Sequence, residues 1–209
     1  MRHFLLIGIF FCLTVAAGEK PLRVVCLGDS LTAGYGLAKE KAWPALIQKY
    51  AEEAGYNTHV QNAGISGETT AGGRRRVAWL LKRPADILII SLGGNDGLRG
   101  INPDVTKENL EAIVDEARKR QPKLRIIVSG MQMPPSMGQI YTDAFREVYP
   151  TIAKEKSVTL IPFLLEGVGG IAAMNLDDGI HPNEAGHLQV AKVVWEYLKP
   201  VLDTMQEPE

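Results

Sequence analysis

Three residues of this 209-residue sequence have side chains that could together perform nucleophilic catalysis: Ser30, Asp178 and His181. A serine hydroxyl is a weak nucleophile by itself and needs a neighbouring base, which a third group holds in the correct orientation. Asp178 precedes His181 by three residues, so its carboxylate can reach the imidazole Nδ1 within a tight turn. We therefore predict Ser30 as the nucleophile, His181 as the general base and Asp178 as the group that orients the base.

Acyl transfer also requires hydrogen-bond donors for the negative charge that develops on the carbonyl oxygen of the substrate. Three candidate donors are the backbone N–H of Ser30, the backbone N–H of Gly64 and the side-chain amide of Asn95. Gly64 has no side chain, so a substrate could approach its backbone closely. Losing one such donor typically costs about 10²–10³-fold in rate, or about 2.7–4 kcal/mol.

These residues lie in a chain that alternates short apolar runs with stretches of helical spacing. The apolar runs, which predict strands, are residues 22–27, 58–61, 87–92, 125–129 and 159–162. The helical stretches are residues 42–54, 70–81, 106–120, 141–156 and 183–202. This alternation predicts right-handed βαβ crossovers and a flavodoxin-like, three-layer α/β/α fold with a five-stranded parallel sheet. No linker or repeat divides residues 19–209, which we expect to form one domain.

In such a sheet, ligands bind beyond the carboxyl ends of the strands. Ser30, Gly64 and Asn95 each follow an apolar run, and the segment with Asp178 and His181 precedes the last helix. Taken singly, Ser30 could instead cap a helix, and the other polar residues could belong to ordinary turns. Taken together at one edge of a sheet, they favour a catalytic site.

A mononucleotide-binding module of the flavodoxin class is an alternative, with phosphate held by the turn at residues 28–36. That turn has neither the Walker spacing with its lysine nor a G-x-G-x-x-G pattern. The binding hypothesis also leaves Asp178 and His181 without a role.

Four sequence blocks resemble those of the GDSL, or SGNH, hydrolases in order and spacing: Gly28-Asp29-Ser30-Leu31, Asn62-Ala63-Gly64, Gly94-Asn95-Asp96 and Asp178-Gly179-Ile180-His181. The resemblance extends from about residue 22 to about residue 202. It is greatest to the multifunctional bacterial acyl-CoA thioesterases that are also lysophospholipases and arylesterases, through "AWPALI", "LGGNDGLRG" and "DDGIHPN". It implies the catalytic roles given above for Ser30, Asp178, His181, Gly64 and Asn95.

The resemblance further implies hydrolysis of carboxylic esters and thioesters of acyl chains through an acyl-serine intermediate, without metal or cofactor. An alternative within the same fold is a carbohydrate O-acetyl esterase. We hypothesise a shallow apolar groove for acyl chains, lined by Ile65, Leu98, Ile101 and Met133. His59 and His187 lack the spacing of metal ligands. The run at residues 74–76 is all arginine, and we favour a solvated helix face there over an anion site.

The N-terminus predicts export. Residues 1–3 form a short segment with basic Arg2, and residues 4–17 are almost wholly apolar. Small residues then precede a polar stretch, as in a secretory signal peptide with cleavage near Ala17 or Gly18. A retained anchor is the alternative. Cleavage would leave Cys26 as the single cysteine, which the apolar pattern predicts to be buried. We expect a periplasmic or secreted monomer without stable membrane insertion.

Composition excludes one class of partner. The chain has 23 Lys and Arg against 24 Asp and Glu, a formal net charge of -1. A nucleic-acid-binding protein would show a basic excess, so we expect a small-molecule acyl ester or thioester as the partner.

Overall fold

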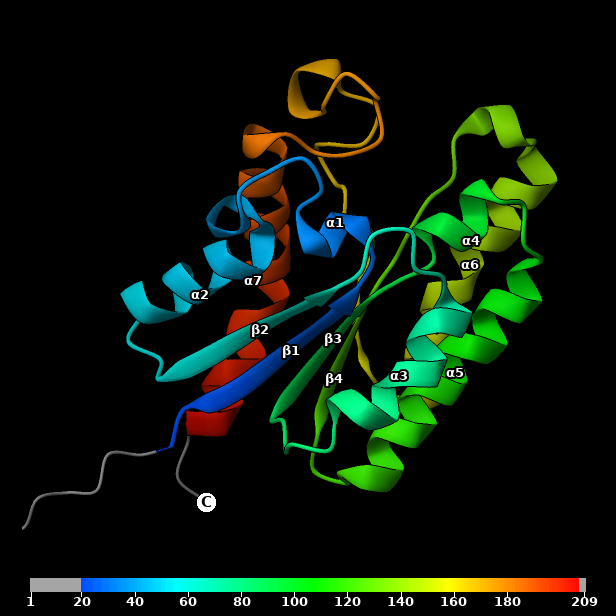
Figure 1. Ribbon diagram of the computed structural model, residues 1–209. Coiled ribbons are helices and arrows are strands. Elements are labelled where there is room, and N and C mark those ends of the chain that lie inside the picture. Colours follow the sequence, from blue (N-terminus) through cyan, green and yellow to red (C-terminus); the bar gives the residue numbers. More distant parts are fainter. Residues whose placement is uncertain (1–19, 207–209) are drawn as a thin grey trace, which may run out of the picture.

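Five parallel strands form one sheet in the order β2-β1-β3-β4-β5 (Figure 1). The computed structural model describes residues 20–206, so the predicted signal peptide at residues 1–18 lies outside the described residues. The strands are β1 (Leu22–Gly28), β2 (Thr58–Gly64), β3 (Ile87–Ser91), β4 (Arg125–Ser129) and β5 (Thr159–Ile161). This order is that of a flavodoxin-like sheet, as the sequence predicted.

Helices cover both faces of the sheet, which makes three layers. The helices are α1 (Ser30–Ala33), α2 (Trp43–Glu53), α3 (Thr70–Leu80), α4 (Gly94–Leu98), α5 (Pro103–Arg120), α6 (Gln139–Lys156) and α7 (Glu184–Gln206), with short 3₁₀ turns η1 (Lys39–Lys41), η2 (Pro135–Met137) and η3 (Ala172–Met174). Helices α2 and α7 pack together on one face, while α3, α5 and α6 cover the other (Figure 1). All five predicted long helices are present, whereas the short helices α1 and α4 were not predicted.

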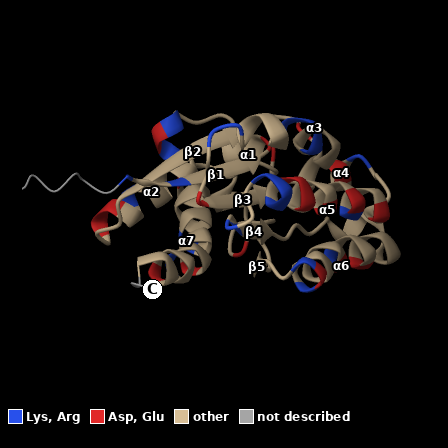
Figure 2. Cartoon of the chain, turned by 90° about the horizontal axis from the view of Figure 1, so that it is seen from below, with Lys and Arg blue, Asp and Glu red and all other residues tan. Residues whose placement is uncertain are grey.

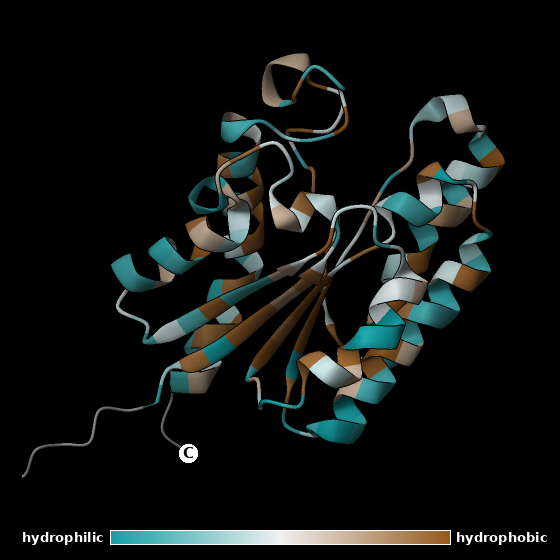
Figure 3. Cartoon of the chain, in the orientation of Figure 1, coloured by the Kyte–Doolittle hydropathy of each residue, from teal (hydrophilic) through white to brown (hydrophobic). Residues whose placement is uncertain are grey.

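The core lies between the sheet and these two helical layers. Every residue of β3 is buried, because the strand is central and covered on both sides. The inner strands are the most hydrophobic part of Figure 3, and polar residues face outward on the helices. Cys26 is fully buried in β1, as predicted. The raised pKa of its thiol follows from that burial.

Strand β2 differs from its prediction, because it extends three residues further, to Gly64. It is an edge strand with only β1 as neighbour, and the two pair in register from Leu22 with Thr58 to Gly28 with Gly64. An edge strand needs no apolar pattern on its exposed side, so polar Gln61 and Asn62 do not end it.

The outer surface carries charges of both signs. Lys and Arg lie among Asp and Glu along α5 and α6, whereas α3 carries the three arginines at residues 74–76 (Figure 2). Within residues 20–206, none of the helices has the length and apolar character needed to cross a membrane.

Candidate active site

The turn after β1 places Ser30 at the first position of α1. Gly28 allows the close approach of this turn, since a Cβ there would lie 1.9 Å from Thr32 Oγ1 and 2.9 Å from the Ser91 carbonyl oxygen. Asp29 caps α1, because its Oδ1 accepts a hydrogen bond from Leu31 N–H at 3.0 Å. The polar turn at the carboxyl edge of the sheet thus holds the Ser30 side chain in a fixed position.

His181 and Asp178 lie in a turn before α7, and that turn reaches Ser30. His181 Nε2 is 3.0 Å from Ser30 Oγ, and His181 Nδ1 is 2.7 Å from Asp178 Oδ2. The three side chains therefore form a hydrogen-bonded chain from carboxylate to imidazole to hydroxyl. This is the geometry that converts a serine into a nucleophile.

Asp178 remains ionised well into acid, which suits a group that orients a histidine. Its Oδ1 accepts the backbone N–H groups of His181 at 2.9 Å and Ile180 at 2.8 Å. These bonds, together with the bond to the His181 side chain, lower the pKa of the Asp178 carboxyl to about 2.

Asn95 lies beside this triad on α4. Its Nδ2 donates to the Glu68 carbonyl oxygen at 3.1 Å and makes a long hydrogen bond of 3.4 Å to Asp29 Oδ2. Asp29 is 1% exposed, and burial raises the pKa of its carboxyl to about 6. The Asn95 amide is therefore held next to the residue that precedes Ser30.

The Ser30 N–H is the second candidate donor. As the first residue of α1, Ser30 has an amide with no acceptor inside the helix. Nucleophile and amide thus belong to one residue, so an oxygen on the carbon that Ser30 attacks would lie near the Ser30 N–H.

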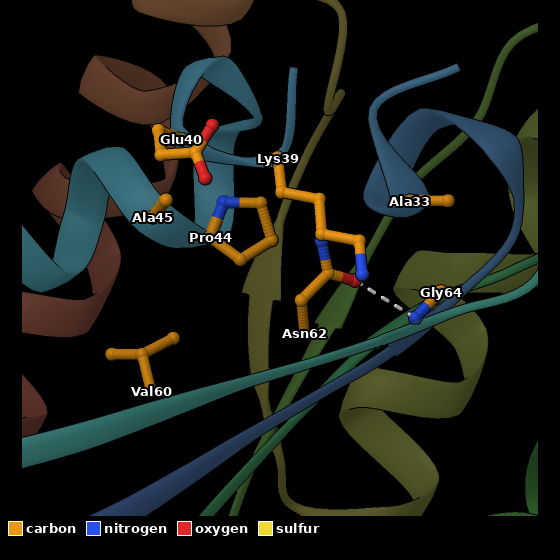
Figure 4. Close-up of a pocket in the computed structure, with 8 residues that line it drawn as sticks. All are labelled: Ala33, Lys39, Glu40, Pro44, Ala45, Val60, Asn62 and Gly64. Carbon is orange, nitrogen blue, oxygen red and sulfur yellow. Dashed lines mark hydrogen bonds between the residues drawn. The ribbon is translucent and has the colours of Figure 1, made fainter. Parts of the chain in front are cut away.

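Gly64, the third predicted donor, does not fit that role. Its N–H already donates to Asn62 Oδ1 at 2.9 Å, drawn as the dashed line in Figure 4. A Cβ on Gly64 would lie 2.2 Å from the Ala33 nitrogen, so α1 occupies the space beside it. Gly64 lines a cavity of about 440 Å³ between α1, α2 and β2, and neither Ser30 nor His181 lines that cavity (Figure 4).

Gly67, which the sequence analysis did not name, is a second glycine of this region that could supply a backbone donor. It lies in the turn after β2 with φ of +78°, and its N–H donates to no atom within residues 20–206. The next residue, Glu68, is the one whose carbonyl binds Asn95. The apolar pattern predicted that β2 ends at residue 61, which would place Gly64 in the following turn. In the structure Gly64 is the last residue of β2, and the turn glycine is Gly67, the second glycine of the sequence Gly-Ile-Ser-Gly.

Three of the four residues predicted to line an acyl groove are accessible to solvent. Ile65 is 50% exposed and Leu98, the last residue of α4, is 45% exposed. Ile101, which lies three residues after the end of α4, is half-buried. Met133 is 9% exposed and packs beneath α4, where a Cβ on Gly97 would lie 2.1 Å from its sulfur. Met133 is therefore a core residue in this structure, contrary to its predicted place in the groove.

Among residues 20–206, His, Cys, Asp and Glu side chains form no cluster of three or more that could hold a metal ion. His187 is buried on α7, where its Nδ1 accepts the Trp43 N–H at 3.2 Å. It supports the start of α2.

A doubly wound parallel sheet with a serine, a histidine and an aspartate at its carboxyl edge defines the class of α/β serine hydrolases. Within that class the chain belongs to the GDSL-like lipase/acylhydrolase family, whose sequence profile matches residues 26–188. It is an esterase of that family, and the nucleotide-binding alternative is thereby overturned.

The relatives agree with this assignment. The chain is 43% identical to Esterase TesA of Pseudomonas aeruginosa, over 97% of this chain and 100% of that protein. It is 39% identical to the Thioesterase 1/protease 1/lysophospholipase L1 of Escherichia coli K12, over 93% of this chain and 92% of that protein. A crystal structure of TesA superposes with a TM-score of 0.82 at 40% identity, covering 86% of this chain and 99% of the other.

Proposed function

We propose that this protein hydrolyses carboxylic esters and thioesters of acyl chains through an acyl-serine intermediate at Ser30. One observation carries the proposal: the continuous chain of hydrogen bonds from Asp178 through His181 to Ser30 Oγ. The names of the relatives support ester and thioester substrates, because they include an esterase and a thioesterase.

In the acylation half of the reaction, His181 Nε2 takes the proton of Ser30 while Oγ bonds to the substrate carbonyl carbon. The carbonyl oxygen becomes an oxyanion, which the Ser30 N–H, the free Gly67 N–H and the Asn95 amide would stabilise, the amide by giving up its long hydrogen bond of 3.4 Å to Asp29 Oδ2. The intermediate then collapses, the carbon–oxygen or carbon–sulfur bond breaks, and His181 gives its proton to the leaving alcohol or thiol.

In the deacylation half, a water molecule replaces the leaving group. His181 takes one proton from this water as its oxygen attacks the acyl carbon, and the same oxyanion donors act again. Collapse releases the carboxylic acid and returns the proton to Ser30 Oγ. Asp178, ionised throughout, holds the imidazole and offsets its positive charge in both halves.

We further propose that the protein is exported and acts as a monomer on small acyl substrates. The basic, apolar and small-residue order of residues 1–18 supports export. The near-balance of 23 basic and 24 acidic residues does not favour a nucleic acid as the partner.

A fluorophosphonate probe tests the nucleophile directly, since it forms a covalent bond with an activated serine. We expect the purified protein to be labelled and to hydrolyse p-nitrophenyl acetate, and we expect Ser30→Ala to abolish both. Labelling that persists in Ser30→Ala would refute the assignment of Ser30.

A substrate panel tests the acyl class. We expect p-nitrophenyl octanoate and octanoyl-CoA to be hydrolysed efficiently, and acetylated xylan poorly. Strong preference for acetylated xylan would instead support the carbohydrate O-acetyl esterase alternative.

A further inference from the structure

The arginine run at residues 74–76 divides into two kinds of side chain. Arg74 and Arg75 are exposed, as the solvated-face prediction requires. The Arg76 side chain is only 16% exposed and forms an ion pair with Glu68, whose side chain is 9% exposed. The solvated-face prediction is therefore wrong for Arg76, which points inward from α3.

The Arg76 guanidinium joins two segments that carry the reacting groups. Its Nε donates to Glu68 Oε1 at 2.9 Å and Oε2 at 2.7 Å, and its Nη2 also binds Oε2. The same Nη2 donates to the Gly28 carbonyl oxygen at 3.1 Å. That oxygen also accepts the Ile65 N–H at 3.0 Å, so the end of β1 and the turn after β2 meet at one point.

Both segments bear on the proposed oxyanion donors. Gly28 precedes Asp29 and Ser30, so its position sets that of the Ser30 N–H. Glu68 follows Gly67, and its carbonyl holds the Asn95 amide. A movement of Glu68 relative to Gly28 would thus change the spacing of all three donors.

Donor spacing matters because preorganised donors act only within about 0.5 Å of the productive geometry. Arginine suits this task, since its planar fork binds a carboxylate and a carbonyl at once, whereas lysine is a single point charge. Nothing in the reaction itself requires the positive charge of Arg76.

We propose that Arg76 is a positioning residue for the reaction: through Glu68 and the Gly28 carbonyl it fixes the turn at residues 65–68 against the Ser30 amide. This inference rests on the proposed function. Arg76 does not touch the substrate, so its loss should weaken stabilisation of the tetrahedral intermediate and leave ground-state binding unchanged.

The test compares Arg76→Gln and Arg76→Lys with the control Arg75→Gln, an exposed arginine on the same helix. For p-nitrophenyl acetate we expect Arg76→Gln to lower kcat by about 10- to 100-fold with KM nearly unchanged, less than the loss of a whole donor. The kcat of Arg76→Lys should lie between those of Arg76→Gln and the wild type, and the kcat of Arg75→Gln should equal that of the wild type.

A second readout separates positioning from mere support of the fold. A trifluoromethyl ketone adds to the serine and forms an oxyanion, whereas the corresponding methyl ketone serves as the ground-state control. We expect Arg76→Gln to weaken inhibition by the trifluoromethyl ketone by the same factor as kcat, with inhibition by the methyl ketone and the shape of the pH profile unchanged. If the Arg76 variants do not fold, Glu68→Gln decides by the same measurements.

Two results would overturn the inference: kcat in Arg76→Gln equal to that in Arg75→Gln, or a loss of activity with unchanged affinity for the trifluoromethyl ketone. Failure of the proposed function looks different. In that case the Ser30→Ala variant would hydrolyse the ester as well as the wild type does. If only the Arg76 inference fails, hydrolysis still depends fully on Ser30.

Discussion

The ring of Tyr35 lies against the imidazole of His181, with ring centroids 4.4 Å apart and planes inclined by 36°. Tyr35 is brought there by the turn after α1, in which Gly34 and Gly36 have φ of +80° and +78°. Its N–H donates to the Ser30 carbonyl oxygen at 3.1 Å. One residue thus links the nucleophile's backbone to the face of the base.

Replacing Tyr35 by alanine should loosen His181 without removing it. An aromatic pair contributes about 0.5–1.5 kcal/mol, so we expect kcat/KM to fall by about 2- to 12-fold in Tyr35→Ala. Tyr35→Phe keeps the ring and should retain nearly full activity toward p-nitrophenyl acetate. Equal loss in both variants would assign the effect to the hydroxyl and contradict the role of the ring contact.

Asp178→Asn should remove the charge that orients and stabilises His181 while leaving the turn intact. An asparagine oxygen can still accept the two backbone N–H groups, so we expect the fold to survive. The expected loss is about 10⁴-fold in kcat, by analogy with the same change in serine proteases. Asp177→Asn, on the exposed neighbouring residue, is the matched control and should keep wild-type kcat.

The pH profile provides an independent check on Asp178. With its pKa at about 2, this carboxylate stays charged at every pH where the protein would be assayed. We therefore expect Asp178 to add no limb to the pH profile of kcat/KM between pH 4 and 8. A limb in that interval that disappears in Asp178→Asn would contradict the lowered pKa of Asp178.

The buried strands and the pairing of Asp178 with His181 could be predicted from the sequence, because both depend on local sequence pattern. Apolar runs locate the buried strands, and the three-residue spacing of Asp178 and His181 fits one turn. The end of β2 could not be read in this way, since an edge strand tolerates polar residues. The Arg76 contact to Gly28 joins residues 48 apart in sequence, so only the folded chain shows it.

Leu98 and Ile65 should set acyl-chain preference if they line the groove. Each methylene that a substrate buries contributes about 0.8 kcal/mol, so removing apolar surface penalises long chains more than short ones. We expect Leu98→Ala to lower the ratio of kcat/KM for p-nitrophenyl octanoate over p-nitrophenyl acetate by about 3- to 10-fold, and Ile65→Ala to act in the same direction.

Met133→Ala is the contrasting variant for chain preference. Because Met133 is buried under Gly97, its truncation should cost about 2–5 kcal/mol of stability, measured by urea unfolding. Its octanoate-to-acetate ratio should stay close to that of the wild type. An unchanged ratio in Leu98→Ala would refute the groove at that residue.

Two buried groups, His187 and Asp29, should give opposite pH dependences of stability. Burial lowers the pKa of His187 from 6.5 to about 4, and its Nδ1 must stay unprotonated to accept the Trp43 N–H. The unfolded chain therefore binds a proton more readily than the folded one. Stability is lost as pH falls from 6.5 to about 4, by on the order of 3 kcal/mol.

Asp29 acts in the other direction. Burial raises the pKa of its carboxyl from 3.8 to about 6, so the folded state takes up the proton first as pH falls. Stability is gained between about pH 6 and 3.8, again by on the order of 3 kcal/mol. Asp178, with its pKa lowered to about 2, loses its contribution only below this window, as pH falls from 3.8 toward 2.

Single substitutions should separate the two contributions, which nearly cancel in the wild type between pH 6 and 4. In urea unfolding, Asp29→Asn should lose stability on acidification, because only the His187 contribution remains. His187→Asn should gain stability over the same interval, because only the Asp29 contribution remains, and the double variant should be flat again. Parallel pH dependences in all four proteins would contradict the opposed shifts, since each substitution removes one of the two groups whose protonation differs between folded and unfolded chains.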